Sequence, residues 1–265
     1  MDKFIKVDNL TYKNIFNNIN MTIVKSTFIS ISGPNKCGKS TLLRILSGQL
    51  PLKSTVYLNN DDITRFSKNN LYKDIAYVNI NETEEFIFPT VEKELLFILD
   101  NLGLKQTIRI RRYKEIIKVL NLEEITQKDP AYLTGKEKIF FVLAQAIIYK
   151  PKLLVLDDIF IGLRKNEVLK VIKVLKALTK SYKMTIIISL DDLYYSLYTD
   201  YLYILDKGKI LLEGIPIEVL KKDNVLNKIG LQIPFMIDLS VKLKDYNLID
   251  DTILNMDKMV NLLWK

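Results

Sequence analysis

The sequence has no histidine and only one cysteine among its 265 residues. The lack of histidine excludes every mechanism that depends on an imidazole and most zinc sites, and a single cysteine excludes an internal disulfide. No apolar run approaches the roughly 18 residues of a membrane-spanning helix. The first residues, MDKFIKVDN, also lack the apolar centre of a signal peptide, so we expect a cytosolic chain that reaches a membrane only through a partner.

Acidic residues are fewer than basic ones, 31 against 39, which gives a formal net charge of +8. An excess of positive charge favours nucleic acid or anionic lipid as a partner. The lysines are scattered along the chain, however, and a generally lysine-rich composition explains the charge without any ligand. We favour this second interpretation and expect no nucleic-acid partner.

Short apolar runs typical of strands alternate with helical patterns along most of the chain, which predicts an α/β fold with a mostly parallel sheet. The predicted strands cover residues 4–7, 19–24, 28–32, 55–58, 75–80, 153–157, 185–189, 202–206 and 209–213. The predicted helices between them cover residues 39–46, 91–99, 113–120, 136–149 and 166–180.

Two regions carry helical patterns alone. No strand pattern interrupts residues 91–149, and after Gly214 three helical segments follow at residues 216–227, 234–245 and 252–263. We therefore predict a main domain over residues 1–222 that contains a helical insert over about 85–150, and a small C-terminal helical appendage over 223–265.

The segment GPNKCGKS, Gly33–Ser40, matches the phosphate-binding P-loop pattern of Gly, four residues and Gly-Lys-Ser. An apolar strand precedes it and a helix follows it, which is the context that places backbone N–H groups around phosphate oxygens at a helix N-terminus. Lys39 is expected to reach the β- and γ-phosphates, and the Ser40 hydroxyl to bind Mg²⁺. The predicted nucleotide-binding residues are Gly33, Pro34, Asn35, Lys36, Cys37, Gly38, Lys39, Ser40 and Thr41.

Two residues of this loop are unusual for the pattern. Lys36 stands where such loops tend to carry a small residue, and it is strained if its φ is positive. Cys37 is explained as a small substitute for serine. Its position at a helix N-terminus beside a lysine also predicts a lowered thiol pKa.

The segment LVLDD, Leu154–Asp158, is an apolar strand that ends in two carboxylates. Asp157 is suited to bind Mg²⁺ through water, and Asp158 is suited to polarise an attacking water. An ordinary buried strand followed by exposed aspartates has the same pattern, so this segment alone does not decide between the two interpretations.

Upstream lies LTGKE, Leu133–Glu137, followed by a helix and by Pro151 just ahead of the acidic strand. This arrangement resembles the ATP-binding cassette (ABC) family, whose LSGGQ signature precedes the acidic strand by the same interval. The resemblance extends over essentially the whole chain, and it implies an ABC-type P-loop NTPase fold with ATP and Mg²⁺ as ligands. It also implies that Thr134 and Gly135 complete a partner's nucleotide site and that Tyr12 stacks on adenine, although an ordinary strand aromatic equally explains Tyr12.

The tail resembles energy-coupling factor (ECF) transporter ATPases, through Gly230–Leu231 and Pro234–Phe235 followed by a closing helix. That resemblance implies a second ABC ATPase, an integral membrane coupling protein and a substrate-binding membrane subunit as partners, with the chain at the cytoplasmic face of the membrane. The appendage would then serve dimerisation. The acidic segment Asn81–Phe86 stands where such ATPases meet coupling helices, but a solvated loop explains it nearly as well.

Several positions depart from the family pattern within the chain's own site. Asp158 replaces the usual glutamate with a shorter side chain, and misplacing a catalytic group by about 1 Å can reduce the rate about 100-fold. The switch histidine falls at Leu190, which has no hydrogen-bonding group. The glutamine that senses Mg²⁺ falls at Ile80, with Asn79 or Asn81 as candidate substitutes.

Other departures concern the surface offered to a partner. Arg164 stands where the family has an aspartate, and Lys136 and Glu137 replace a glycine and a glutamine of the signature. Lys136 is either an extra phosphate contact or a solvated lysine at a helix start. Together the departures predict retained Mg-ATP binding, slow turnover by this chain alone and a heterodimer with a more typical ATPase.

Our leading hypothesis is therefore the ATPase subunit of an ECF-type ABC transporter, with Asp158 as its catalytic residue and Ser40 and Asp157 as its metal ligands. A catalytically weak ATP-binding scaffold in a heterodimer is the first alternative. The second alternative is a non-transport ABC protein that acts on nucleic acid. Salt-dependent binding of the chain to DNA or RNA would support it.

Overall fold

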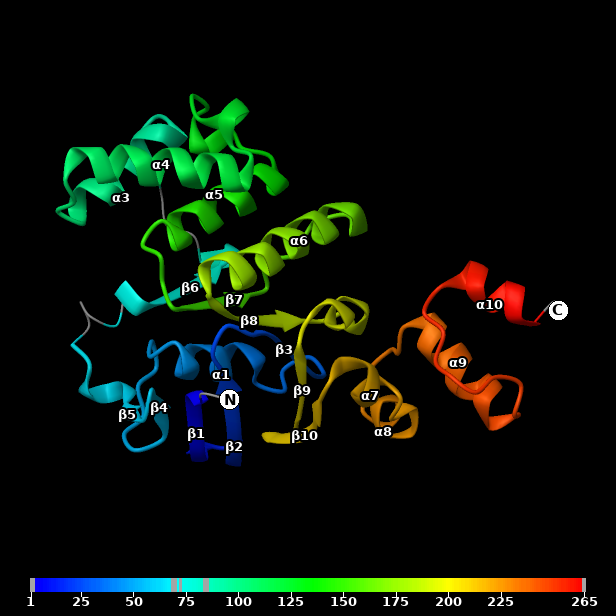
Figure 1. The fold of residues 1–265 in the computed structure, drawn as a ribbon. Coiled ribbons are helices and arrows are strands. Elements are labelled where there is room, and N and C mark those ends of the chain that lie inside the picture. The colour runs from blue at the N-terminus through cyan, green and yellow to red at the C-terminus, as the bar shows by residue number, and fades with distance from the viewer. Residues whose placement is uncertain (1–2, 68–70, 72, 83–85, 264–265) are drawn as a thin grey trace. The chain divides into compact units, whose positions relative to one another are not determined.

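The computed structural model describes residues 3–67, 71, 73–82 and 86–263 (Figure 1). The chain forms two compact units, which we describe separately. The first unit comprises Met1–Leu10, Asn20–Phe28 and Ser40–Ser189. The second comprises Thr11–Ile19, Ile29–Lys39 and Leu190–Lys265.

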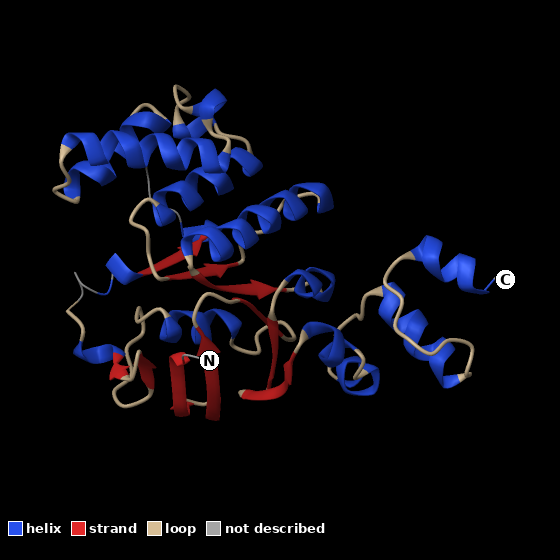
Figure 2. Ribbon diagram, in the orientation of Figure 1, coloured by secondary structure: helices blue, strands red, loops and turns tan. Residues whose placement is uncertain are grey.

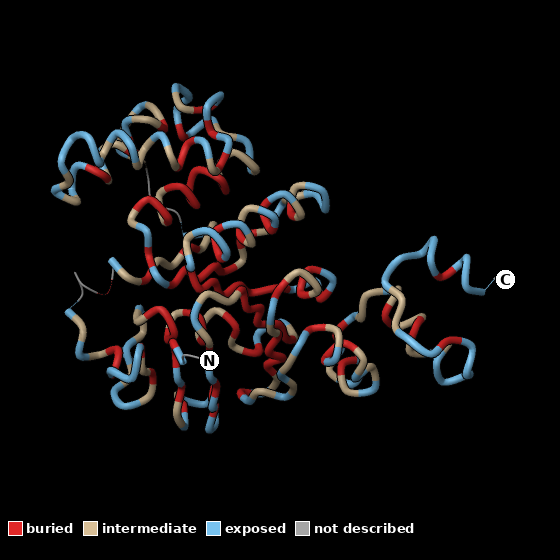
Figure 3. The backbone as a smooth tube through the Cα atoms, in the orientation of Figure 1, coloured by how far each residue is buried: buried red, intermediate tan, exposed pale blue. Residues whose placement is uncertain are grey.

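Three parallel strands form the centre of the first unit: β6 (Ile75–Asn79), β7 (Leu153–Asp157) and β8 (Thr185–Leu190). The register places Asn79 opposite Asp157. Every residue of β7 and β8 is buried (Figure 3), as expected for parallel strands that are covered on both faces. The apolar run ahead of Asp157 is therefore a buried central strand, as predicted.

Helices α3 (Val91–Asn101), α4 (Gln106–Leu120) and α5 (Gly135–Ile147) contact one another, and α5 also contacts β6. Figure 2 shows this group as helices joined by loops, which agrees with the helical pattern predicted for residues 91–149. The first unit also contains α6 (Lys165–Tyr182) and, from Ser40 on, most of α1 (Lys39–Leu46).

A second, antiparallel sheet has the strand order β2-β1-β4-β5. Its strands are β1 (Lys3–Tyr12), β2 (Phe16–Val24), β4 (Val56–Leu58) and β5 (Asp61–Asp62). Short 3-10 helices complete the connections at Ile63–Arg65 (η1), Ile80–Glu82 (η2), Glu123–Ile125 (η3), Pro130–Tyr132 (η4) and Leu193–Tyr198 (η5).

In the second unit, β3 (Phe28–Ser32) pairs in parallel with β9 (Tyr201–Asp206), which pairs antiparallel with β10 (Lys209–Gly214). Four helices follow: α7 (Pro216–Leu220), α8 (Asp223–Lys228), α9 (Phe235–Asp245) and α10 (Met256–Leu263). Side chains from β9, η5 and these helices share one buried cluster, formed by Leu193, Leu202, Ile204, Val219, Leu220, Leu226, Leu231 and Ile237. The first C-terminal helices are thus anchored on β9 by apolar packing.

Several boundaries differ from the sequence prediction: β1 extends to Tyr12 and not only to Val7, β2 begins at Phe16 and not at Ile19, and α10 begins at Met256 and not at Thr252. Helix α4 begins at Gln106 and not at Tyr113. The sequence pattern missed its first two turns because they are rich in basic residues and carry little apolar periodicity. The predicted helix at 216–227 is divided into α7 and α8, since Lys222 has a ψ of 53° that a continuous helix does not allow. Over the described ranges, no helix is both long and apolar enough to cross a membrane.

Candidate nucleotide site

The phosphate loop connects β3 to α1 through a tight turn in which the Cys37 N–H donates to the Pro34 carbonyl at 3.2 Å. Gly38 has a φ of 105°, and a Cβ at this position would lie 2.8 Å from the ring of Phe16. A Cβ at Gly33 would lie 2.1 Å from the Leu205 carbonyl oxygen. Close packing therefore requires glycine at both Gly33 and Gly38.

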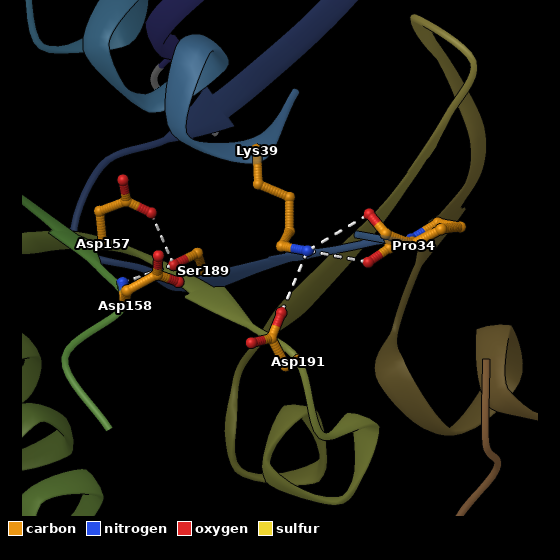
Figure 4. A network of polar contacts seen from close by, with 7 residues as sticks. Pro34, Lys39, Asp157, Asp158, Ser189 and Asp191 are labelled. Atoms are coloured by element: carbon orange, nitrogen blue, oxygen red, sulfur yellow. Dashed lines mark hydrogen bonds and ion pairs between the residues drawn. The ribbon is translucent and has the colours of Figure 1, made fainter. Parts of the chain in front are cut away.

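Lys39 is buried, and its ammonium group is surrounded by oxygens. It donates to the Gly33 carbonyl at 2.9 Å and to the Pro34 carbonyl at 3.5 Å. It also pairs with the Asp191 carboxylate at 3.1 Å, as Figure 4 shows. Asp191 thus gives Lys39 the anionic partner that a nucleotide phosphate would supply, and sequence analysis did not single it out although it directly follows Leu190.

The two unusual loop residues have different outcomes. Lys36 has a φ of 64°, so the strain anticipated for a non-glycine residue is present. Burial raises the pKa of the Cys37 thiol, and this effect outweighs the lowering by the nearby Lys39. The predicted activation of Cys37 is therefore wrong, because the thiol is packed into the loop beside Gly33.

The β1–β2 turn lies beside the phosphate loop. Ile15 and Phe16 approach Gly38, and the Asn17 N–H donates to the Gly208 carbonyl at 3.0 Å. Tyr12 stands at the start of this turn, is only partly buried, and has the Lys13 ammonium 5.1 Å from its ring centre. The stacking of Tyr12 on adenine stays a prediction. The turn that follows Tyr12 does lie against the phosphate loop.

Asp157 is fully buried at the end of β7, and its carboxylate accepts hydrogen bonds from three side chains. Ser189 donates to Oδ1 at 2.9 Å, while Tyr77 and Asn79 donate to Oδ2 at 3.0 and 3.3 Å. Ser189 Oγ also accepts the Asp158 N–H at 2.9 Å (Figure 4). Sequence analysis considered Asn79 and missed the other two donors.

Asp158 has a left-handed φ of 53°, a conformation that aspartate tolerates better than most residues and that is frequent at functional sites. Burial raises the pKa of Tyr77, hydrogen bonds from Arg44 and Asn79 oppose this rise, and Asp157 adds to it. The Tyr77 hydroxyl therefore keeps its proton at neutral pH, and it donates a hydrogen bond to the Asp157 carboxylate.

The donors available for a metal ion are hard oxygens, the Ser40 hydroxyl and the Asp157 carboxylate. Mg²⁺ is typically bound by one or two carboxylates together with substrate phosphates, and not by a closed protein cage. Within the described ranges, no group of three or more His, Cys, Asp or Glu side chains could hold a metal. The residues present thus fit Mg²⁺ bound together with a nucleotide.

Residues 16–160, more than half of the chain, match the family described as ABC transporter. The chain belongs to this ABC ATPase family. It is 30% identical over 218 residues to an energy-coupling factor transporter ATP-binding protein, EcfA, of Methanoculleus marisnigri, an alignment that covers 82% of this chain and 79% of the relative. The ABC-type P-loop NTPase fold and the ATPase class predicted from sequence are confirmed.

Solved structures of ABC ATPases have the same fold. CbiO1 of Clostridium perfringens, described as part of the ABC transporter complex CbiONQ, superimposes with a TM-score of 0.77 at 27% identity over 90% of this chain and 99% of that one. An ATP-binding cassette solved as a dimer with ADP and Pi superimposes with a TM-score of 0.68 at 23% identity, covering 80% of this chain and 98% of that one.

The segment at the ABC signature position caps a helix. Thr134 and Glu137 form a reciprocal capping box at the start of α5, and Lys128 pairs with Glu137 at 2.7 Å. The hydrogen bond from Lys128, followed by those from Thr134, lowers the pKa of Glu137 to about 2. A Cβ on Gly135 would meet nothing within 4 Å, so the surface at Gly135 is open.

The catalytic departures from the ABC pattern have clear structural counterparts. Leu190 ends β8 and is 3% exposed, so it is a core side chain without polar atoms. Ile80 begins η2, and Arg164 precedes α6 with its N–H bonded to Glu167 at 2.9 Å. Of the acidic segment Asn81–Phe86, residues 83–85 lie outside the described residues.

Proposed function

We propose that the chain is the ATP-binding subunit of an ECF-type ABC transporter, which couples Mg-ATP binding and hydrolysis to substrate uptake through membrane partners. The observation that carries this proposal is the buried Lys39, whose ammonium is held by loop carbonyls and by a single exposed carboxylate. We expect an incoming phosphate to take the place of that carboxylate beside the Lys39 ammonium.

Mg²⁺ would be held by the Ser40 hydroxyl and by Asp157, and when bound it would neutralise phosphate charge. Three side chains orient the Asp157 carboxylate through hydrogen bonds. Asp158, tethered through its backbone N–H to Ser189, is the proposed residue that orients the attacking water.

Slow turnover by the chain alone is part of the proposal. Leu190 is buried and apolar, so it offers no hydrogen bond to a γ-phosphate, and Ile80 offers no side-chain oxygen. The same observations favour the second candidate, an ATP-binding scaffold that hydrolyses almost nothing. Phosphate release from the chain alone and from its heterodimer with a typical ABC ATPase separates the two, since only a coupled subunit would contribute to hydrolysis in the pair.

The partners proposed are a second ABC ATPase, a membrane coupling protein and a substrate-binding membrane subunit, which would place the chain at the cytoplasmic face of the membrane. The similarity to EcfA and to CbiO1 supports this assembly. The proposed domains remain residues 1–222, with the insert at about 85–150, and a dimerising appendage at 223–265. Exposed apolar side chains of the appendage support dimerisation: Phe235, Tyr246, Leu248, Leu254, Met256, Val260 and Leu262.

The binding part is tested with Lys39→Ala, studied by calorimetry with ATP and Mg²⁺. We expect ATP binding to be lost or greatly weakened, because a charge-assisted contact to phosphate is removed. Lys53→Ala, at an exposed lysine, is the matched control and should bind like the wild type. Equal ATP affinity in Lys39→Ala and wild type would refute the nucleotide site.

The transport part is tested by tagging the chain in its native cell and identifying proteins that co-purify from detergent-solubilised membranes. We expect one further ABC ATPase and at least one integral membrane protein. Recovery of nucleic acid without membrane proteins would instead support the non-transport alternative.

A further inference from the structure

Ile80, where the family's metal-sensing glutamine is expected, has no polar side-chain atom. The Asp157 carboxylate nevertheless accepts three hydrogen bonds, one from Ser189 and two from other residues. Two of its three hydrogen bonds come from β6, both to Oδ2. The parallel register explains this, because Asn79 lies opposite Asp157, and Tyr77, two residues earlier, faces the same side of the strand.

Asn79 is engaged at both ends of its amide. Its Nδ2 donates to Asp157 at 3.3 Å, while its Oδ1 accepts the Asn81 N–H at 2.9 Å. The second bond fixes which end of the amide faces Asp157. Asn79 thus holds the carboxylate as a donor, and its oxygen is used by the turn that begins η2, so Asn79 does not replace the glutamine as a metal ligand.

Tyr77 supplies the shorter of the two hydrogen bonds from β6. Its hydroxyl donates to Oδ2 of Asp157 at 3.0 Å, against 3.3 Å for the Asn79 amide. The Tyr77 hydroxyl is therefore the principal β6 donor that holds the Asp157 carboxylate.

We propose that Tyr77 is the positioning residue of the metal site: assisted by Asn79, it orients the Asp157 carboxylate. This inference rests on the proposed function, since it assumes that Ser40 and Asp157 bind Mg²⁺ together with ATP.

The test compares ATP affinity with Mg²⁺ and with EDTA in the wild type and in Tyr77→Phe, which keeps the ring and removes only the hydroxyl. Partners that orient a metal ligand typically contribute about 10-fold to metal affinity. We expect about a 10-fold loss in the Mg²⁺ affinity of the ATP complex, with metal-free ATP binding unchanged. Tyr132→Phe, at a tyrosine that is 83% exposed, is the control and should have no effect.

A second variant separates positioning from general stability. Asn79→Ala should also weaken Mg²⁺ binding, and its combination with Tyr77→Phe should weaken it further, because both side chains donate to Oδ2 of Asp157. Unchanged Mg²⁺ affinity in Tyr77→Phe, or an equal loss with Mg²⁺ and with EDTA, would overturn the positioning role. Failure of the wild type to bind ATP under both conditions would instead overturn the proposed function itself.

Discussion

Removing the charge of Asp191 should raise the affinity for ATP. The Lys39 ammonium lies 3.1 Å from the Asp191 carboxylate, and nucleotide phosphate needs the same ammonium, so the two anions compete. In Asp191→Asn the side chain keeps its shape and an acceptor oxygen but loses its charge. The Lys39 side chain is 10% exposed, whereas that of Asp191 is 68% exposed, so solvent screens the pair strongly. We therefore assign it about 0.5–1 kcal/mol, the range of exposed ion pairs.

That free energy corresponds to about a two- to five-fold tighter ATP complex. The assay is calorimetric titration of wild type, Asp191→Asn and the control Asp250→Asn, at low and at high salt. The gain should shrink as ionic strength rises, because the Asp191 carboxylate of the competing pair is solvent-exposed. Unchanged affinity would show that Asp191 does not compete with phosphate, and weaker binding would mean that its carboxylate assists the bound nucleotide.

Three further predictions concern the same site. Cys37, the only thiol, should react slowly with a bulky alkylating reagent, because it is buried and its pKa is raised. Mg-ATP should slow this alkylation further. Equal alkylation rates with and without Mg-ATP would show that Cys37 lies away from the ligand. Lys36→Gly should raise stability by about 0.5–1 kcal/mol, since relief of a left-handed φ exceeds the entropy that glycine loses, and the melting temperature should rise by about 2–3 °C. Asp158→Glu combined with Leu190→His should raise phosphate release far more than the product of the single effects, because such groups act as a unit. Fast wild-type hydrolysis that is lost in Asp158→Asn would show instead that Asp158 is already an adequate base.

The sequence alone determined the parts of the site that are contiguous in the chain. Gly33–Ser40 specifies its own turn, because its glycines, lysine and serine act within a single strand–loop–helix unit. Strands β3 and β7 have the predicted bounds, since a short, mostly apolar run followed by a glycine-containing loop or a carboxylate pair is a strong local pattern. The departures at Leu190 and Ile80 were also visible, because they are substitutions within recognisable motifs.

Only the tertiary structure decided which distant residues meet the motif residues. Within the second unit Asp191 reaches Lys39, and within the first unit the register of the parallel strands brings Tyr77 and Ser189 to Asp157. These contacts are not encoded in local spacing. The pKa of Cys37 was mispredicted for the same reason: the neighbouring lysine is visible in the sequence, but the burial that outweighs it is a property of the packed loop.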